Sequence, residues 1–559
     1  MTSSRTLAIA LLLVLVAGPL TASAQGREMS TADRVAMLYA PQLNFTRDGD
    51  PLIRLGILEG RDSVEFTPTQ PIRVMPHGEG GAEIHLPANT TYTVSITDSR
   101  AGEYKHWVVV DRVSVDKRAR VDDVNRQWTQ RGYIPESFEV GGLFAVHGQL
   151  FDSRVILVCV GGTATLAEAN KIRAQLEARY GIAGAMHSER LKFPSGLLTL
   201  KGKGVDVTVQ HRDVMWASAM PGKEETIAYT IPNIRKSYER GEETRRYTGS
   251  LIFAADRNGK VVVINSLGAE KVLKGVVPAE VYASAPENAL QAQAIAARNE
   301  IFAAIGVRNL ADPYMLRADV YDQVYGGIDV EHPRTSAAVE ATRGEVMLYG
   351  TQIVNAVYSS NAAGFTENNE NVWDAEPRPH LRGKLDTAAA NLPAQFKGGV
   401  TEAKLEAFLA SDFPAYSKDA PVGSAALYRW TRTVEAKTPI AWLKEAGHDI
   451  GRIKDVKVLS RGVSGRVIRF ELKGEKSDAV IERELNVRRL FGGLRSGLFI
   501  VTFDRDKNGF VTNFHFRGGG FGHGVGMCQT GAVGMAAKGH SHKEILLHYY
   551  QGIGIRKLY

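Results

Sequence analysis

The chain has 559 residues, too many for a single hydrophobic core, so its length predicts roughly two to four domains. With 44% hydrophobic and 23% charged residues, the composition is that of an ordinary globular protein, and there is no low-complexity tract. The net charge of +7 suits an anionic or carboxylate-bearing partner. The basic stretches at 115–120 and 236–246 interleave acids and lack the aromatic spacing of a nucleic-acid platform, so we expect no nucleic-acid partner.

The N-terminus has the pattern of a cleavable secretory signal. Arg5 precedes an apolar run over 7–17, a Gly-Pro pair breaks the run, and small residues follow at 22–24. The run is shorter than the ~20 apolar residues that a spanning helix needs, and no later stretch is apolar enough. Residues 1–24 are therefore predicted to be a signal peptide. We expect an exported, periplasmic or extracellular protein without a membrane span after cleavage.

Residues 25–150 are predicted to be a β-rich domain, because short alternating runs such as YTVSIT and HWVVVD are separated by Gly, Pro and Asn. Residues 151–246 are predicted to be a small α/β segment. In it, the apolar strand RVILVCV and a turn precede an amphipathic helix, TLAEANKIRAQLEARYG. This unit resembles small repeat-type domains that bind bare peptidoglycan strands, and any ferredoxin-like fold would give the same pattern.

The region 247–559 begins with strands at 251–256 and 260–267 and continues into an alanine-rich helix predicted over about Ala285 to Ile305. Ser284 and Glu287 have the spacing of a capping box. The helix is apolar nearly all round, which is typical of a buried helix. Gln293 and Arg298 on it therefore need polar partners. They either hold neighbouring loops in place or line a cleft.

Short clusters of Ala, Gly and Pro at about 385–425 indicate a connection or insertion between two halves of this region. A helix, IAWLKEAG, and three strands, DVKVLSR, RVIRFELKG and LFIVTF, are predicted after it. The sequence thus predicts a multi-domain α+β protein. A β-rich N-terminal region precedes a mixed α/β, two-lobed region with a central alanine-rich helix, which we expect to line a cleft.

The glycine-rich stretch GGGFGHGVGMCQTGA at 518–532 raises the question of its ligand. It lacks the Lys-Ser/Thr of a P-loop, and G-x-G-x-x-G fails in every frame, so nucleotide binding is excluded. His523 and Cys528 are followed by three more histidines, but no C-x-x-C pair or H-E-x-x-H helix organises them, so we expect no metal and no cofactor. The chain's other cysteine, Cys159, lies in a predicted buried strand, which favours two independent thiols over a disulfide.

Glu280, in GVVPAE, is the strongest acid–base candidate. Its carboxylate is predicted to lie between an apolar strand and the buried helix, where desolvation raises the pKa toward that of a general acid working near neutral pH. A cap or a surface charge at a loop–helix junction is the alternative interpretation. A serine nucleophile has less support, because no G-x-S-x-G elbow is present and the Ser-x-x-Lys pattern at 114–117 lies in a β-rich stretch.

Six motifs in order resemble the stage II sporulation protein D and amidase-enhancer family of bacterial cell-wall proteins. These are LKGVVPAEVYASAPENALQAQAIAAR (273–298), DVYDQVYGG (319–327), ATRGEVMLYG (341–350), AVYSSNAAGFTENNENVW (356–373), LRSGLFIVTF (494–503) and GGGFGHGVGMCQTGAVGMAAKGHSHKEILLHYY (518–550). The resemblance implies a lytic transglycosylase that cleaves glycan strands stripped of stem peptides. Its catalytic glutamate falls on Glu280. The resemblance also implies association with the cell wall. As residues that support Glu280 or bind the substrate, we further expect Gln293, Arg298, Gln323, Tyr325, His523 and Gln529.

Two departures from the family bear on the chemistry. Some members hold zinc with Cys and His near the stretch matching 319–325, where this chain has Asp319 and Asp322 instead. Cys528 stands where serine is usual, which suggests a small packed side chain. The glycine loop is expected to fold tightly against the alanine-rich helix and to leave N–H groups facing a cleft, whose wall it forms.

Two other functions remain open at this point. The family name also covers a non-catalytic, wall-binding activator of an N-acetylmuramoyl-L-alanine amidase, whose partner would be that amidase. An ordinary hydrolase would need a second carboxylate to position water, for which Asp319, Asp322, Glu367 and Glu370 are available.

Overall fold

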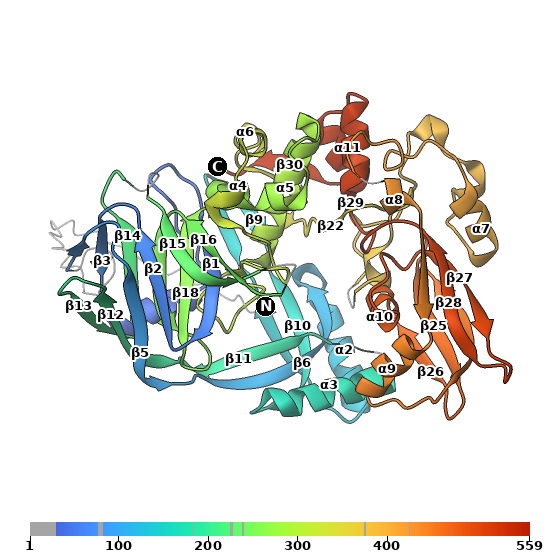
Figure 1. Ribbon diagram of the computed structural model, residues 1–559, viewed down its shortest axis with the longest axis horizontal. Helices are drawn as coiled ribbons and strands as arrows, with labels where there is room; N and C mark the ends of the chain where they lie inside the picture. Colours follow the sequence, from blue (N-terminus) through green and yellow to red (C-terminus); the bar gives the residue numbers. More distant parts are fainter. Residues whose placement is uncertain are drawn as a thin grey trace, which may run out of the picture.

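The computed structural model describes residues 30–76, 82–180, 182, 184–223, 227–236, 240–373, 376–423 and 425–559, and the predicted signal peptide lies outside them. The molecule contains both helices and several β-sheets, which confirms the expected α+β class. Figure 1 shows a β-rich body on the left and a group of helices at the top centre. A second, mainly β-stranded lobe lies on the right.

Two sheets form the β-rich body and share one hydrophobic core. Alternating side chains such as Val64 and Phe66 enter this core because successive residues of a strand point to opposite faces. The seven-stranded sheet has the order β19(Leu316–Arg317)-β1(Leu52–Arg61)-β18(Val261–Gly268)-β17(Ser250–Ala255)-β14(Val214–Ala219)-β3(Ile72–Met75)-β4(Ile84–Leu86). The six-stranded sheet has the order β13(Thr208–Arg212)-β12(Ser195–Gly202)-β5(Tyr92–Arg100)-β2(Ser63–Pro68)-β15(Tyr229–Arg235)-β16(Glu242–Tyr247).

A four-stranded antiparallel sheet with two helices forms a ferredoxin-like unit. Along the chain its elements are β6(Glu103–Ser114), α2(Ala119–Gln130), β7(Glu136–Val140), β10(Val155–Thr163), α3(Leu166–Tyr180) and β11(Met186–Lys192). In space the order is β11-β6-β10-β7, the arrangement of a split βαβ fold. The predicted strand and helix at 153–184 are confirmed as β10 and α3. The topology fits both interpretations that the sequence left open.

The domain boundaries predicted at 150/151 and 246/247 stay predictions. At both positions, strands that lie before and after the boundary pair in the same sheet. β6 pairs with β10 across the first, and β1 pairs with β18 across the second. Strands on either side of each position therefore fold as parts of one sheet.

Three helices follow the β-rich body: α4(Ala269–Glu280), α5(Glu287–Ala304) and α6(Pro333–Ala341). α5 is the predicted alanine-rich helix, and it is buried on nearly every side. One part of its surface joins the core of the β-rich body, and another packs with α11(Gln529–Ala537) and α12(His542–Tyr549). The predicted capping box is not formed, because the helix begins one residue after Pro286, and no side chain caps it.

The second lobe has its own core. It is built on two three-stranded sheets, β23(Trp430–Glu435)-β28(Val511–Gly518)-β27(Phe499–Arg505) and β24(Ile453–Arg461)-β25(Val467–Gly474)-β26(Ala479–Glu482), with α9(Lys437–Glu445) and α10(Glu484–Leu490). The predicted helix and strands of this part are confirmed. The segment 385–425 holds α7(Glu402–Ala410) and contributes to a smaller cluster with Phe365 and Leu498.

The C-terminus returns to the centre of the molecule, near α4 and α6 (Figure 1). β30(Gly554–Lys557) pairs with β20(Glu345–Tyr349), in a sheet that also holds β21(Gln352–Ile353), β9(Gln149–Asp152) and β8(Leu143–Val146). Both cysteines are buried free thiols, so the prediction of two independent thiols is confirmed. Among the described residues, no helix is both long enough and apolar enough to cross a bilayer.

Candidate active site around Glu280

Glu280 is the last residue of α4, which corrects the expectation that it lies between a strand and a helix. The β-branched pair before Pro278 and the proline itself have low helix propensity. However, Val272, Val276 and Leu273 are buried with the spacing of a helix face. The carboxylate is thereby placed at a helix C-terminus, where the helix dipole disfavours negative charge.

The carboxyl group of Glu280 has the properties of a general acid. The residue is half-buried, and burial raises its pKa to about 7. No ion pair or hydrogen bond joins this carboxylate to another of the described residues. A carboxyl group of this pKa is protonated in an appreciable fraction of molecules at neutral pH, as proton donation to a leaving group requires.

Gln529 connects Glu280 to α5. Its amide nitrogen donates to the backbone oxygen of Glu280 at 2.9 Å and to Oε1 of Gln293 at 3.2 Å. Gln529 is the first residue of α11, so three helices meet at this point. The expected partner of Gln293 is thus the glutamine of the C-terminal motif, which brings two of the predicted residues next to Glu280.

Tyr358, in β22(Tyr358–Ser359), is a member of the site that the sequence did not single out. Its phenol lies near the carboxyl groups of Glu280 and Glu300 and near the Gln323 amide. Burial and the two acids raise the pKa of Tyr358 well above its usual value, so it is a neutral hydroxyl. Its place in the motif AVYSSN was visible, but only the fold shows that it faces Glu280.

Two amides near Glu280 have a buried polar atom without a hydrogen-bond partner among the described residues. They are Nε2 of Gln293 and Oε1 of Gln323, and both residues are buried. A buried polar atom without a partner is costly, and at a functional site it is available to a ligand. One amide offers a donor and the other an acceptor, so the pair can bind a neutral polar ligand.

His523 is a neutral ring beside Tyr358. Burial, together with the charges of Arg466 and Arg488, lowers the pKa of His523 to about 3, and its ring also interacts with the Tyr358 backbone. Nδ1 accepts the backbone N–H of Val525 at 3.0 Å, so the proton of the neutral ring is on Nε2. His523 can therefore donate a hydrogen bond from Nε2, but it cannot supply a positive charge at neutral pH.

The glycine loop was expected to pack tightly against the alanine-rich helix, but its closest contacts are with other segments. A side chain at Gly526 would meet the Val357 oxygen at 2.0 Å, and one at Gly524 would meet the Arg466 guanidinium at 2.3 Å. Both glycines have positive φ values, which glycine adopts without strain. The loop therefore lies against β22 and Arg466, whereas α11 after the loop packs on α5.

The expectation that the N–H groups of this loop face a cleft is also wrong for most of them. Within the protein, Phe521 donates to Asn361, Gly522 to Arg495 and Gly524 to the Ser359 hydroxyl. The loop is thus a bonded wall beside Tyr358, and its side chains supply the available polar groups. Cys528 is a packed residue as expected, since burial raises the pKa of its thiol to about 12.

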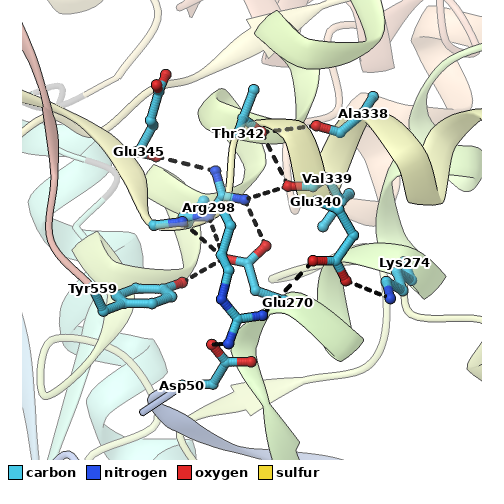
Figure 2. Close-up of polar contacts among 12 residues, drawn as sticks. Asp50, Glu270, Lys274, Arg298, Ala338, Val339, Glu340, Thr342, Glu345 and Tyr559 are labelled. Atoms are coloured by element: carbon cyan, nitrogen blue, oxygen red, sulfur yellow. Dashed lines mark hydrogen bonds and ion pairs between the residues drawn. The ribbon is translucent and has the colours of Figure 1, made fainter. Parts of the chain in front are cut away.

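Arg298 supports the site from behind, in the network shown in Figure 2. Its guanidinium donates two hydrogen bonds to the Glu270 carboxylate, at 2.8 and 2.7 Å, and one to the backbone oxygen of Glu345 at 3.0 Å. Tyr559 donates to the same carboxylate at 2.7 Å. The buried pair therefore joins α4, α5, β20 and the C-terminus, and Arg298 is a loop-holding residue with no exposed surface.

Tyr325 lies in the core and not beside Glu280. It is 1% exposed, and its hydroxyl donates to the Asn265 side chain at 3.3 Å. Its ring packs against Gly275 of α4, where a Cβ would meet it at 2.6 Å. Tyr325 therefore positions α4 without facing the site.

The four acids considered for a hydrolase all have other partners. Asp322 binds Asn309 and Arg308, Asp319 binds Arg317, and Glu370 binds Arg382. Glu367 accepts bonds from the backbone of Asn368, Val463 and Ser464 and from two side chains. Within the described residues, no group of three or more His, Cys, Asp and Glu is arranged to hold a metal ion.

Comparison with known proteins agrees with the motif analysis. The family described as Stage II sporulation protein matches residues 257–349, and a domain of unknown function (DUF8618) matches 367–526. An uncharacterized protein of Brachyspira hyodysenteriae is 30% identical over 309 residues, which is 55% of this chain and 72% of that protein. The Stage II sporulation protein D of Bacillus subtilis is 26% identical over 306 residues, or 52% of this chain and 75% of that protein.

The Amidase enhancer of Bacillus subtilis is 28% identical over 295 residues, which cover 50% of this chain and 39% of that protein. The matches thus extend over about half of the chain, and the ordered motifs lie in the same region as Glu280, Tyr358 and the glycine loop. This chain belongs to the stage II sporulation protein D and amidase-enhancer family.

Proposed function

We propose that the protein is a lytic transglycosylase that cleaves peptidoglycan glycan strands from which the stem peptides have been removed. The observation that carries the proposal is Glu280, a half-buried carboxyl group with a pKa of about 7 and no charged partner among the described residues. A transglycosylase needs one group that first donates and then accepts a proton, and such a group works best when its pKa is close to the working pH.

The proposed reaction uses Glu280 twice. Its carboxyl proton goes to the glycosidic oxygen as the bond to C1 of the sugar breaks. The carboxylate then takes the proton of the same sugar's 6-hydroxyl as that oxygen bonds to C1. Tyr358, Gln293 and Gln323 are proposed to hold the sugar through their hydroxyl and amide groups, and neutral His523 is a further hydrogen-bonding group.

The positions of the other acids favour this reaction over hydrolysis. The four acids considered above are bonded to other groups. Glu300, also near Tyr358, is 8% exposed, contacts Arg308 at 3.8 Å and accepts a bond from the Asn355 amide at 2.7 Å. An inverting hydrolase needs a free carboxylate that activates water. A transglycosylase does not, because its nucleophile belongs to the substrate.

Product analysis tests the proposal. The purified chain is incubated with peptide-free glycan strands, and the ends are identified by mass spectrometry. The expected products carry 1,6-anhydro ends. Reducing ends would indicate a hydrolase, and either that result or intact strands would overturn the proposal.

A second candidate function has one observation in its favour, the similarity to a protein named Amidase enhancer. In that case this chain would bind the wall and stimulate an N-acetylmuramoyl-L-alanine amidase. The test adds the chain to such an amidase acting on intact peptidoglycan and measures peptide release. Stimulation that persists in Glu280→Gln, without strand cleavage by the wild type, would favour the activator.

We also propose that the protein is exported and associates with the cell wall, and that its ferredoxin-like unit contributes to wall binding. Fractionation of cells followed by immunoblotting tests the location. Because β1 pairs with β18, a fragment that ends before residue 247 lacks part of a sheet. The wall-binding test is therefore co-sedimentation of full-length surface variants with insoluble peptidoglycan.

A further inference from the structure

Three segments that are far apart in the sequence meet beside α5, and each contributes an arginine. They are β6 of the ferredoxin-like unit, the segment after α5, and the segment after residue 375. Arg112, Arg308 and Arg378 are the three arginines, and we refer to them as the arginine cluster.

Arg112 lies on the face of the ferredoxin-like sheet that is turned away from its two helices. In the β10–β6 register Arg112 is opposite Leu157, and Leu157 packs with Val307 and Leu310 beyond α5. Arg308 lies between these two residues in the chain. The sheet and the segment after α5 are also joined by a bond from the Gly141 N–H to the Gly306 oxygen at 2.6 Å.

Arg378 is brought to the same end of β6 by a chain of ion pairs. Arg120 binds Asp111, the neighbour of Arg112, at 2.9 Å, and it also binds Glu376. Lys117 contacts Glu376 at 3.3 Å. The segment that contains Arg378 is thus fixed against the start of α2 by contacts that do not involve Arg378 itself.

The cluster has more guanidinium groups than partners. Arg308 contacts Asp322 at 3.2 Å and Glu300 at 3.8 Å. The side chains of Arg112 and Arg378 form no hydrogen bond or ion pair with any other residue that the structure describes, although both are half-buried. Burial, followed by the charges of Arg308 and Arg378, lowers the pKa of Arg112, which confirms that like charges lie close together.

Glu280 and the arginine cluster lie beside two different positions of α5. Gln293, which shares Gln529 with Glu280, and Glu300, which contacts Arg308, lie two turns apart on one face of α5. Two turns correspond to about 10 Å along the axis. Tyr358 lies near both Glu280 and Glu300, so the acid and the residue that contacts the cluster share this neighbour.

We propose that the arginine cluster binds the free lactyl carboxylate of a muramic acid residue in the strand that Glu280 cleaves. A guanidinium is planar and presents paired donors that match a carboxylate. In an intact strand this carboxyl group forms the amide bond to the stem peptide and carries no charge. It becomes an anion only after the peptide is removed. The cluster therefore recognises stripped strands by the charge that stripping creates.

This inference rests on the proposed function for the identity of the glycan, so its test measures binding separately from cleavage. The full-length Glu280→Gln chain is titrated with stripped strands and with the same strands after their carboxyl groups have been converted to methyl amides. We expect the methyl amides to bind at least about tenfold more weakly. Equal affinity for the two substrates would overturn the inference, and this comparison needs no further variant.

Arginine variants locate the effect. Arg112→Gln and Arg378→Gln, each in the Glu280→Gln background, should lose affinity for stripped strands about tenfold and bind methyl-amide strands unchanged. Arg469→Gln is the matched control, because Arg469 lies in an exposed pair with Glu482 in the other lobe. Circular dichroism confirms folding, and Arg112→Lys, which retains the charge, should recover part of the affinity. Variants that fold and bind stripped strands like the control would overturn the inference.

The two proposals can fail independently. Carboxylate-dependent binding without cleavage by the wild type would leave this inference standing and refute the transglycosylase. Equal cleavage of stripped and methyl-amide strands, with unchanged affinity in the arginine variants, would refute this inference and leave the transglycosylase standing. Competition by inorganic phosphate at equal affinity for both kinds of strand would show a general anion site and also overturn the inference.

Discussion

The side chain of Gln529 donates a hydrogen bond to the backbone oxygen of Glu280 at 2.9 Å, so the C-terminal glycine motif directly holds the end of the helix that carries the acid. The two residues are far apart in the sequence. The bond uses a helix-end carbonyl, a group that lacks a partner within its own helix. Because the same amide also binds Gln293, one side chain links α4, α5 and α11.

Gln529→Ala should lower cleavage more than it lowers stability. The variant leaves the Glu280 carbonyl and Gln293 Oε1 without this donor, which costs about 1–3 kcal/mol if water cannot replace it. We expect about a tenfold loss in kcat/KM, measured on stripped strands, because the end of α4 is free to move. Gln529→Glu, which keeps the size but removes the donor, is the matched comparison and should not restore activity.

Arg298→Met should destabilise the protein severely. The substitution removes one partner of a buried ion pair and leaves the Glu270 carboxylate buried without its guanidinium. The free energy of unfolding should fall by about 3–5 kcal/mol. Chemical unfolding measures the loss, and the double variant with Glu270→Gln should recover part of it. Arg469→Met, in an exposed pair, should cost less than about 1 kcal/mol. Equal effects of the two single variants would contradict the structural role of Arg298.

Patterns of burial were predictable from the sequence because they are local. The alanine-rich helix, the alternating strands and the need of Gln293 and Arg298 for partners all follow from the residues themselves. The helical state of Glu280 was not predicted, although Leu273, Val276 and Val277 have helical spacing, because a β-branched pair followed by a proline is locally unfavourable for a helix. In this case packing against the β-rich body overrides local preference.

Two features of the site, Tyr358 and the arginine cluster, could not be predicted, because they come from long-range contacts. Tyr358 faces Glu280 only after β22 pairs with β29(Met527–Cys528), and the glycine loop follows that pairing. The arginine cluster requires the ferredoxin-like sheet to dock on the end of α5. No spacing in the sequence signals either contact.

Both cysteines should resist thiol reagents in the native protein. Burial raises the pKa of both Cys159 and Cys528 to about 12, so the reactive thiolate is scarce as well as covered. Titration with Ellman's reagent should find almost no rapid reaction in buffer and two thiols in denaturant. Rapid labelling of the folded chain, with Cys528→Ser used to identify the residue, would show that the glycine loop opens.

His523→Asn should retain more activity than His523→Ala. An asparagine oxygen can replace Nδ1 as acceptor of the Val525 N–H, whereas alanine leaves that donor without its partner. Because the pKa of His523 is held at about 3, neither variant should shift the alkaline limb of the pH–rate profile. A shift of that limb in His523→Asn would mean that the histidine titrates during the reaction.

Cleavage by the wild type should fall as pH rises through about 7. The first step needs the protonated form of Glu280, whose pKa is raised to about 7 by burial, so kcat/KM on stripped strands should decrease about tenfold per pH unit well above that value. The profile is measured between pH 5 and 9 at constant ionic strength. A rate that keeps rising to pH 9 would exclude Glu280 as the proton donor.

Glu280→Gln should abolish strand cleavage while preserving the fold and the binding of strands. The amide cannot donate to the glycosidic oxygen or take the 6-hydroxyl proton, so the rate should fall by roughly 10²–10⁴-fold. Stability should respond to pH in a defined direction. The folded-state pKa of about 7 lies above the ordinary value of 4.5, so the native protein holds an extra proton between these values.

The stability that this proton gives the wild type is complete below pH 4.5 and is lost as pH rises through about 7, by at most about 3 kcal/mol. The glutamine variant has no such group, so its advantage in unfolding free energy over the wild type should grow across that interval and level off above it. Urea unfolding at pH 5 and at pH 8 measures the difference. A constant difference between the two chains would show that the pKa of Glu280 is not raised, and wild-type cleavage by Glu280→Gln would place the acid elsewhere.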